Sequence, residues 1–71
     1  MEIAVVGTPE FTLGFQLAGI STLYNPEGEE ERIKVFRDLL NSKDVGIVVV
    51  DSAVLASLPE RLRLQLSGSV S

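Results

Sequence analysis

Residues 2–19, EIAVVGTPEFTLGFQLAG, hold the pattern that decides the fold. The first five residues are mostly apolar and end at Gly7, which predicts a short buried strand. Thr8 can cap a helix that starts at Pro9, because a proline in the first turn loses no helical hydrogen bond. Gly19 supplies a helix stop. A strand followed at once by a helix predicts an α/β fold built from β–α–β units.

The predicted helix has one apolar face, on which Phe11, Phe15 and Ala18 fall together. We expect this face to pack on the sheet as part of the core. Gly14 lies between the two aromatic residues and would let the helix approach a neighbour closely. Glu10 sits near the positive end of the helix dipole, which favours a helix start here.

The alternation continues along the chain. Residues 20–24 predict a second, weaker strand, and Asn25 is expected to cap a helix that ends between Asn41 and Asp44. On that helix we expect Glu30 and Lys34 to form an i,i+4 ion pair. Residues 45–50, VGIVVV, predict the strongest strand. A continuous β-branched run is typical of a parallel sheet that is covered on both faces.

The tail allows two interpretations. Leucines at 62, 64 and 66 alternate with polar residues, which is a strand signal. Leucines at 55, 58, 62 and 66 also share one helical stripe, and a helix should follow a third parallel strand. We therefore predict a helix with a break at Leu58-Pro59, and a soft end over residues 67–71.

Composition excludes several classes of protein. The chain has 71 residues, net charge −4, and neither cysteine nor histidine, so it lacks disulfides, thiolate metal sites and the commonest general base. Basic residues begin only at Arg32, which argues against nucleic acid as a partner. No apolar run approaches the roughly 20 residues of a membrane span, and no signal peptide is visible. One small cytosolic domain is expected.

The glycines near the start of the chain do not match the known nucleotide-loop patterns. The P-loop spacing fails because Phe15 stands where lysine is required. The dinucleotide pattern G-x-G-x-x-G fails because Pro9 stands where its second glycine must let a pyrophosphate approach. Glu10 would also repel an anion at the helix start. The five residues GTPEF, Gly7 to Phe11, resemble the opening of methionyl-tRNA formyltransferases, but the chain lacks the histidine and the length that their chemistry needs.

Asp51 and the acidic run from Glu27 to Glu31 could each act in a site or only stabilise a helix start. The stretch VGIVVVDSAVL resembles the phosphoacceptor strand of response-regulator receivers, with Asp51 as acceptor. The receiver's acidic pair is missing after the first strand, so we expect Asp51 or Ser52 to be a helix cap. The acidic run from Glu27 to Glu31 points around a helix rather than toward one cation. We interpret it as a solvated first turn.

Over its whole length the chain resembles the F subunit of the archaeal and vacuolar-type rotary ATPases. That family has the block G-F-x-L-A-G after its first strand, found here at residues 14–19, with Gln16 where arginine is usual. Residues 44–47, DVGI, resemble its D-I/V-G-I-I strand, and residues 55–70, LASLPERLRLQLSGSV, resemble its third helix. The resemblance implies a three-layer, open parallel sheet of Rossmann-like or receiver-like type, with strand order 2-1-3.

The resemblance also implies a function. It suggests a non-catalytic central-stalk component, without cofactor, metal ion or catalytic residue, peripheral to the cell membrane on its cytoplasmic side. The expected role is coupling and regulation of proton- or ion-transport-linked ATP synthesis and hydrolysis. The expected partners are the coiled-coil D subunit of the central stalk and, mainly through a C-terminal helix, the nucleotide-binding A and B subunits. A degenerate receiver-like interaction module and a small nucleotide-binding domain remain as alternatives.

Members of that family continue into a fourth strand and a C-terminal helix. We therefore expect residues 1–71 to form a single N-terminal α/β domain whose third strand, residues 45–50, is an exposed apolar edge. Self-association or low stability would follow from such an edge. Docking residues are expected on the turns at the strand ends and on the first helix, at Thr8, Glu10, Gln16 and Ser52.

Overall fold

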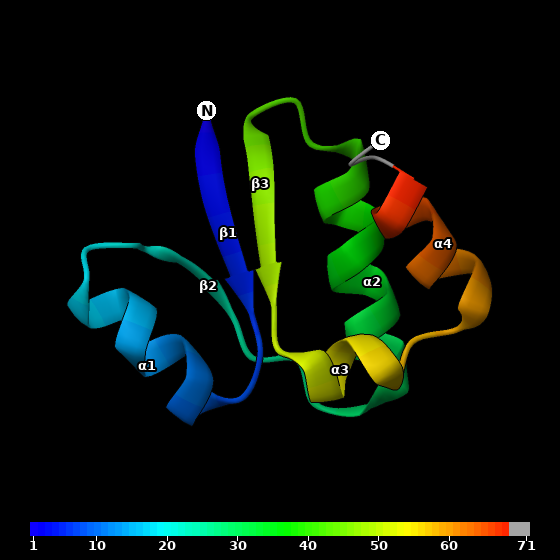
Figure 1. Ribbon diagram of the computed structural model, residues 1–71, viewed down its shortest axis with the longest axis horizontal. Helices are drawn as coiled ribbons and strands as arrows, with labels where there is room; N and C mark the ends of the chain where they lie inside the picture. Colours follow the sequence, from blue (N-terminus) through cyan, green and yellow to red (C-terminus); the bar gives the residue numbers. More distant parts are fainter. Residues whose placement is uncertain (69–71) are drawn as a thin grey trace.

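The computed structural model describes residues 1–68, in which strands and helices alternate (Figure 1). The elements, in chain order, are β1 (Glu2–Val6), α1 (Pro9–Leu17), β2 (Thr22–Tyr24), α2 (Gly28–Asn41), β3 (Val45–Val50), α3 (Ser52–Ala56) and α4 (Glu60–Gly68). The alternation predicted from the sequence is confirmed. The second strand is shorter than expected. The irregular end was predicted to begin at residue 67, but α4 continues through residue 68. Residues 69–71 of that prediction lie outside the described part.

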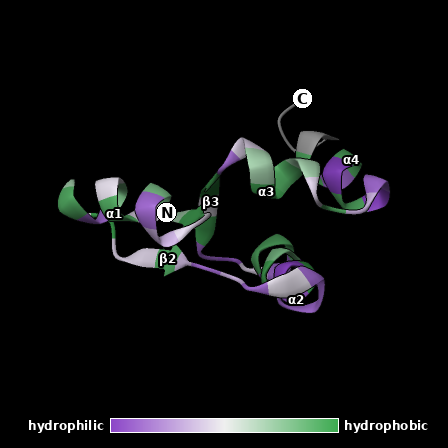
Figure 2. Cartoon of the chain, turned by 90° about the horizontal axis from the view of Figure 1, so that it is seen from below, coloured by the Kyte–Doolittle hydropathy of each residue, from purple (hydrophilic) through white to green (hydrophobic). Residues whose placement is uncertain are grey.

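The three strands form one parallel sheet in the order β2-β1-β3, as the resemblance implied. β1 is the central strand: Ala4 lies beside Thr22 of β2 on one side and beside Val48 of β3 on the other. Figure 2 shows α1 and α2 on opposite sides of this sheet. The result is the predicted three-layer, open α/β arrangement.

The main core lies between the sheet and the helices α2 and α4. Ala4 and Val6 of β1 are completely buried, and so is Phe36 of α2. The predicted leucine stripe of the tail packs here: Leu58 and Leu62 are buried, and Leu55 and Leu66 pack against them. The break at Pro59 is also confirmed, since it separates α3 from α4. The helical interpretation of the tail is therefore correct.

Local signals at both ends of α1 act as predicted. The Thr8 side chain caps the helix by accepting a hydrogen bond from the Phe11 N–H at 3.3 Å. At the other end Gly19 has φ +102°, a conformation that favours glycine. The Gly19 and Ile20 N–H groups donate to the carbonyls of Gln16 and Phe15, which is the Schellman arrangement.

Two local predictions about α2 are wrong. Its N-cap is Glu27 rather than Asn25, and the Glu27 N–H donates to the Glu31 carboxylate at 2.7 Å. Lys34 pairs with Asp38 at 3.4 Å instead of with Glu30. Both partners of this ion pair are exposed, so we expect it to contribute little to stability.

β3 is less buried than its sequence predicted. All its residues are half-buried or exposed, and Ile47 is 44 % exposed. The physical reason is that α1 makes its main contacts with β1 and β2, so the face of β3 that looks toward α1 lacks a helix cover in the described part of the chain. The expectation of a strand covered on both faces is therefore wrong.

The outer edge of β3 has no strand partner within residues 1–68. A groove of about 730 Å³ runs beside this edge, and most of its lining residues are apolar, including Leu39, Val48, Leu55 and Leu66. The strand itself carries neither a charge nor a proline, which are the residues that usually protect an edge. Self-association of the chain stays a prediction that this edge supports.

The core analysis predicts the effect of Phe36→Ala. Removing this buried ring should cost about 3–5 kcal/mol of unfolding free energy, because it leaves a cavity at the contact of α2 with the sheet. The total free energy of unfolding of a domain of this length is only roughly 4–10 kcal/mol, so the variant should be largely unfolded. Urea denaturation followed by circular dichroism measures the change.

The matched control is Leu40→Ala on the same helix. Leu40 is 38 % exposed, so its truncation should cost far less. Equal loss of stability in the two variants would contradict the placement of the core.

Candidate functional site

The carboxyl end of the sheet is the first place to look for a site. In open parallel sheets, ligands bind where neighbouring strands send their connections to opposite faces. Here that point lies between β1 and β3, which continue into α1 and α3 respectively. The residues at this point are Gly7, Thr8, Asp51 and Ser52.

Side chains of the protein already fill the crevice next to Gly7. A Cβ atom built on Gly7 would lie 2.5 Å from Cδ2 of Phe11 and 3.1 Å from Cβ of Asp51. Gly7 is therefore required for close packing of the β1–α1 turn against the end of β3. A phosphate group needs such space for its own oxygens, and here the Phe11 ring occupies it.

The polar groups of this end are used to cap helices. Thr8 satisfies an N–H group at the start of α1, and the Asp51 carboxylate accepts a hydrogen bond from the Ala53 N–H at 3.0 Å. The prediction that Asp51 is a cap is confirmed, since it is the N-cap residue of α3. A carboxylate committed to its own helix start is poorly placed to hold a metal ion or accept a phosphoryl group.

Asn25 fixes the β1–α1 turn to the end of β2, a role that the sequence reasoning missed. Its side-chain amide donates to the carbonyl of Gly7 and to Oγ1 of Thr12, both at 2.9 Å. Thr12 is only 3 % exposed. The available signal was Thr12 itself, a polar residue within one turn of Phe11 and Phe15 on the inner side of the helix. Such a residue needs a partner when it is buried.

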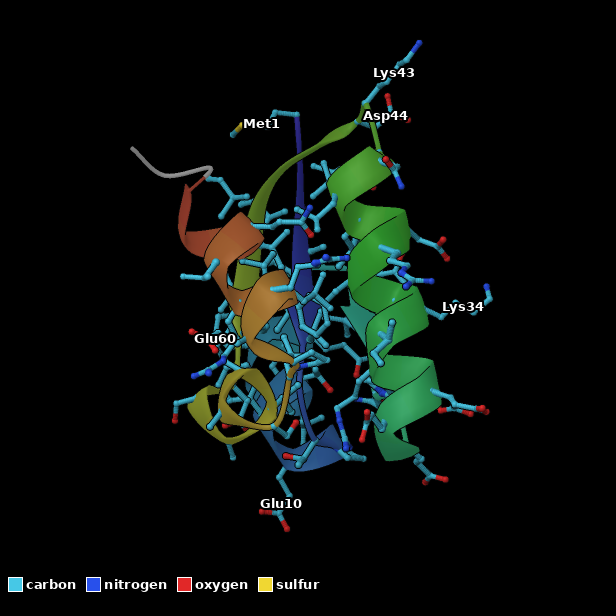
Figure 3. The ribbon with its side chains drawn as sticks, turned by 90° about the vertical axis from the view of Figure 1, so that its right-hand side faces the viewer. Met1, Glu10, Lys34, Lys43, Asp44 and Glu60 are labelled. Carbon is cyan, nitrogen blue, oxygen red and sulfur yellow. The ribbon has the colours of Figure 1, made fainter. Side chains whose placement is uncertain are left out.

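The four predicted docking residues are all exposed. Thr8, Glu10 and Ser52 gather at the carboxyl end of the sheet, and Figure 3 shows Glu10 projecting away from the molecule there. Gln16 does not join them, because it lies further along α1 on the side of Thr12. Their role in docking remains a prediction.

The predicted apolar face of α1 is correct for two of its three residues. Phe11 and Phe15 are half-buried, with ring centroids 5.2 Å apart. Ala18 is exposed because it is the C-cap residue, beyond the last helical turn. The expected close neighbour of Gly14 is also missing, since a Cβ there would meet no atom within 4 Å. The prediction of close packing at Gly14 is wrong for contacts within residues 1–68.

The acidic side chains of the described chain do not converge on a metal ion. Residues 1–68 contain no group of three or more His, Cys, Asp or Glu side chains that could hold one. Within the Glu27–Glu31 run, the Glu31 carboxylate accepts a hydrogen bond from the Glu27 N–H at the start of α2. Over the same residues, every helix is too short or too polar to cross a membrane.

Comparison with known proteins gives consistent matches over nearly the whole chain. The family described as ATP synthase (F/14-kDa) subunit matches residues 3–67. The F subunit of the A-type ATP synthase of Archaeoglobus fulgidus is 44% identical, over 97% of this chain and 68% of that protein. The protein of the same name from Methanospirillum hungatei is 44% identical, over 99% of this chain and 70% of that protein.

A solved structure agrees with these matches. The crystal structure of the F subunit of the V-type ATP synthase from Archaeoglobus fulgidus superimposes with a TM-score of 0.83. The identity is 43%, and the match covers 99% of this chain and 88% of that chain. The sequence and the fold therefore point to the same relatives.

The two glycines of the opening stretch should respond to alanine with opposite signs. Gly7→Ala should destabilise the fold by about 1–3 kcal/mol, because the added methyl group collides with Phe11 and Asp51. Gly14→Ala should stabilise it by about 0.5–1 kcal/mol, because the methyl group meets open space and the unfolded chain loses freedom. Thermal and urea unfolding of the two variants measure both changes. A loss of stability in Gly14→Ala would show that a neighbour packs on this glycine.

The cap at Asp51 predicts a second pair of outcomes. Asp51→Ala should cost about 1 kcal/mol, whereas Asp51→Asn should keep most of the stability because asparagine caps nearly as well. Incubation of the unchanged chain with acetyl phosphate and Mg²⁺ should leave its intact mass unchanged. A gain of one phosphoryl group that disappears in Asp51→Asn would instead support a receiver-like acceptor.

Proposed function

Because the chain belongs to the family of the ATP synthase (F/14-kDa) subunits, we propose that it is a non-catalytic component of the central rotor stalk of an archaeal or vacuolar-type ATP synthase. The observation that carries the proposal is the match over residues 3–67 together with the shared fold. In this role the domain contributes to the coupling and regulation of ion-transport-linked ATP synthesis and hydrolysis.

A non-catalytic role is supported by the chemistry of the described residues. At the sheet end where open α/β sheets bind ligands, Phe11 packs against Gly7, and the side chains of Thr8 and Asp51 cap helices. The sequence contains no histidine or cysteine that could serve as base or nucleophile. A protein of this kind acts through its surface rather than through a pocket.

The proposed partners follow from the assigned place in the complex. The domain binds the coiled-coil D subunit of the stalk, and further partners are the nucleotide-binding A and B subunits. It lies on the cytoplasmic side of the membrane as a peripheral part of the complex. We propose that residues 1–71 form its single N-terminal α/β domain, and that Thr8, Glu10, Gln16 and Ser52 are available for docking because all four are exposed.

The two alternative functions have less support. A nucleotide-binding domain would need space for phosphate at Gly7, which the Phe11 ring fills. A receiver would need a free acidic cluster around Asp51, whereas this carboxylate binds the start of α3.

The stalk assignment predicts direct binding to the coiled-coil subunit of the same complex. The purified 71-residue chain should bind this subunit with a micromolar or tighter dissociation constant, roughly the range of specific protein pairs. Biolayer interferometry with the immobilised coiled-coil subunit measures it. An unrelated antiparallel coiled coil of similar length and charge serves as the control surface. Equal binding to both surfaces, or to neither, would refute the assignment.

A further inference from the structure

We propose that the outer edge of β3 pairs with the same edge of a second copy of this chain. The two β3 strands run antiparallel about a two-fold axis and join both sheets into one continuous sheet. This dimer is independent of the stalk assignment. Its basis is the direction of the backbone groups of β3, the apolar groove beside the strand and the placement of the charges.

The backbone groups of Val48 and Val50 point away from the sheet. The Asp51 N–H donates to the Val6 carbonyl at 3.0 Å, so the backbone at Asp51 is directed toward β1. Because this direction alternates along a strand, Val49 also bonds toward β1, whereas Val48 and Val50 direct their N–H and carbonyl groups outward. No strand within residues 1–68 meets these outward groups. Such an edge is a template for pairing with another strand.

The form of the occupant follows from this edge and from the groove beside it. Only an extended segment can bond to the edge along its length. None of the described residues that line the groove carries a charge, so the segment should be apolar as well. Residues 45–50, VGIVVV, meet both conditions. Within residues 1–68 the other strands fit less well, because β1 is paired on both edges and β2 has three residues.

The direction of the backbone also selects the register of the two strands. In an antiparallel pair, residues whose groups point toward each other exchange both hydrogen bonds. Val48 opposite the same residue of the second copy meets this condition on the two-fold axis, and it places Val50 opposite Gly46. A shift of two residues, centred on Ile47, keeps the direction but sets Val50 opposite Asp44, outside the strand. We therefore place the axis at Val48.

This register matches apolar side chains on both faces of the joined sheet. Opposite residues of an antiparallel pair point to the same face. The two copies of Val48 therefore meet on the face that α2 and α4 cover, so both helix layers lie on one side (Figure 2). On the other face Ile47, which is 44 % exposed in the chain alone, lies opposite Val49 of the second copy. Dimer formation thus removes apolar surface from water on each side of the sheet.

The free surface of the chain is sufficient for a dimer of this kind. A compact protein of 7.7 kDa exposes roughly 4,300 Å², whereas this chain exposes 5005 Å². The surplus of about 700 Å² is close to what one partner buries in a standard interface, about 800 Å².

The charges of the chain oppose this contact only weakly. Two copies with net charge −4 repel each other at long range. The acidic run Glu27–Glu31, however, lies at the start of α2, whereas Leu39 and Leu40, which line the groove, belong to its last turn. β3 is itself uncharged and is flanked by Asp44 and Asp51. Added salt should therefore strengthen the dimer, because it screens the repulsion and leaves the apolar contact intact.

The first experiment uses the unchanged chain. Sedimentation equilibrium should show monomers and dimers with a dissociation constant of roughly 1–100 µM, at the weak end of interfaces of this size. Amide hydrogen exchange measured by NMR then locates the contact. The amides of Val48 and Val50 should become protected as the protein concentration rises, whereas Val49 should be protected at every concentration because it bonds to β1.

The second experiment compares two substitutions that change the net charge equally. Ile47→Lys places at the edge a residue that natural sheets use to prevent pairing, and it should weaken the dimer by about tenfold or more. Leu17→Lys is the matched control, because Leu17 is 80 % exposed on α1, on the other side of the sheet. It should change the dissociation constant by less than about twofold. Circular dichroism verifies that both variants are folded.

Three results would overturn the dimer through β3. The unchanged chain could stay monomeric at every concentration, which would leave the edge to a strand of a different segment or protein. It could dimerise without protection of the Val48 and Val50 amides. Finally, Leu17→Lys could dissociate the dimer while Ile47→Lys leaves it intact, which would assign the contact to α1.

Discussion

The structure depends on the burial of one short strand, β1, between two parallel neighbours. Ala4, Val5 and Val6 are completely inaccessible, and they contact β2 on one edge, β3 on the other, and a helix layer on each face. At the end of this strand the chain turns where there is no room for a side chain. Gly7 meets that requirement, and the close packing of Phe11 and Asp51 around it determines how α1 and α3 leave the sheet. The same packing brings Phe11 and Asp51 against Gly7, at the sheet end where other α/β proteins bind ligands.

The features predicted correctly from the sequence are those with a local cause. Thr8 and Gly19 act on hydrogen bonds within a few residues of themselves, so their roles at the ends of α1 could be read directly. The break at Pro59 is local for the same reason. The order of the strands within the sheet is not local, and it came from the resemblance to a family, whereas the pattern of residues predicted only that the strands are parallel.

The wrong predictions concern side chains whose partners are distant or are one of several choices. Asn25 has the sequence context of a helix cap, yet its amide reaches Gly7, 18 residues away, because the ends of β1 and β2 lie side by side. Lys34 had acidic residues within reach in both directions along α2, and periodicity does not decide between them. The β-branched run of β3 indicated a buried strand, but hydrophobicity alone does not tell which faces a fold covers. The docking residues of the candidate site are harder still to predict, since an exposed polar side chain gives no sign of what it contacts.

The partial cover of β3 gives the proposed docking function a physical basis. A domain whose polar groups at the sheet end cap its own helices is expected to act through other parts of its surface. The face of β3 that looks toward α1 differs, because Ile3 and Ile47 stay partly exposed to water in the middle of an apolar sheet. The free energy of burying them is available to binding because folding has not already used it. In the block at residues 14–19, which carried the family resemblance, Phe15 packs on Phe11, whereas Leu17 and Ala18 are exposed.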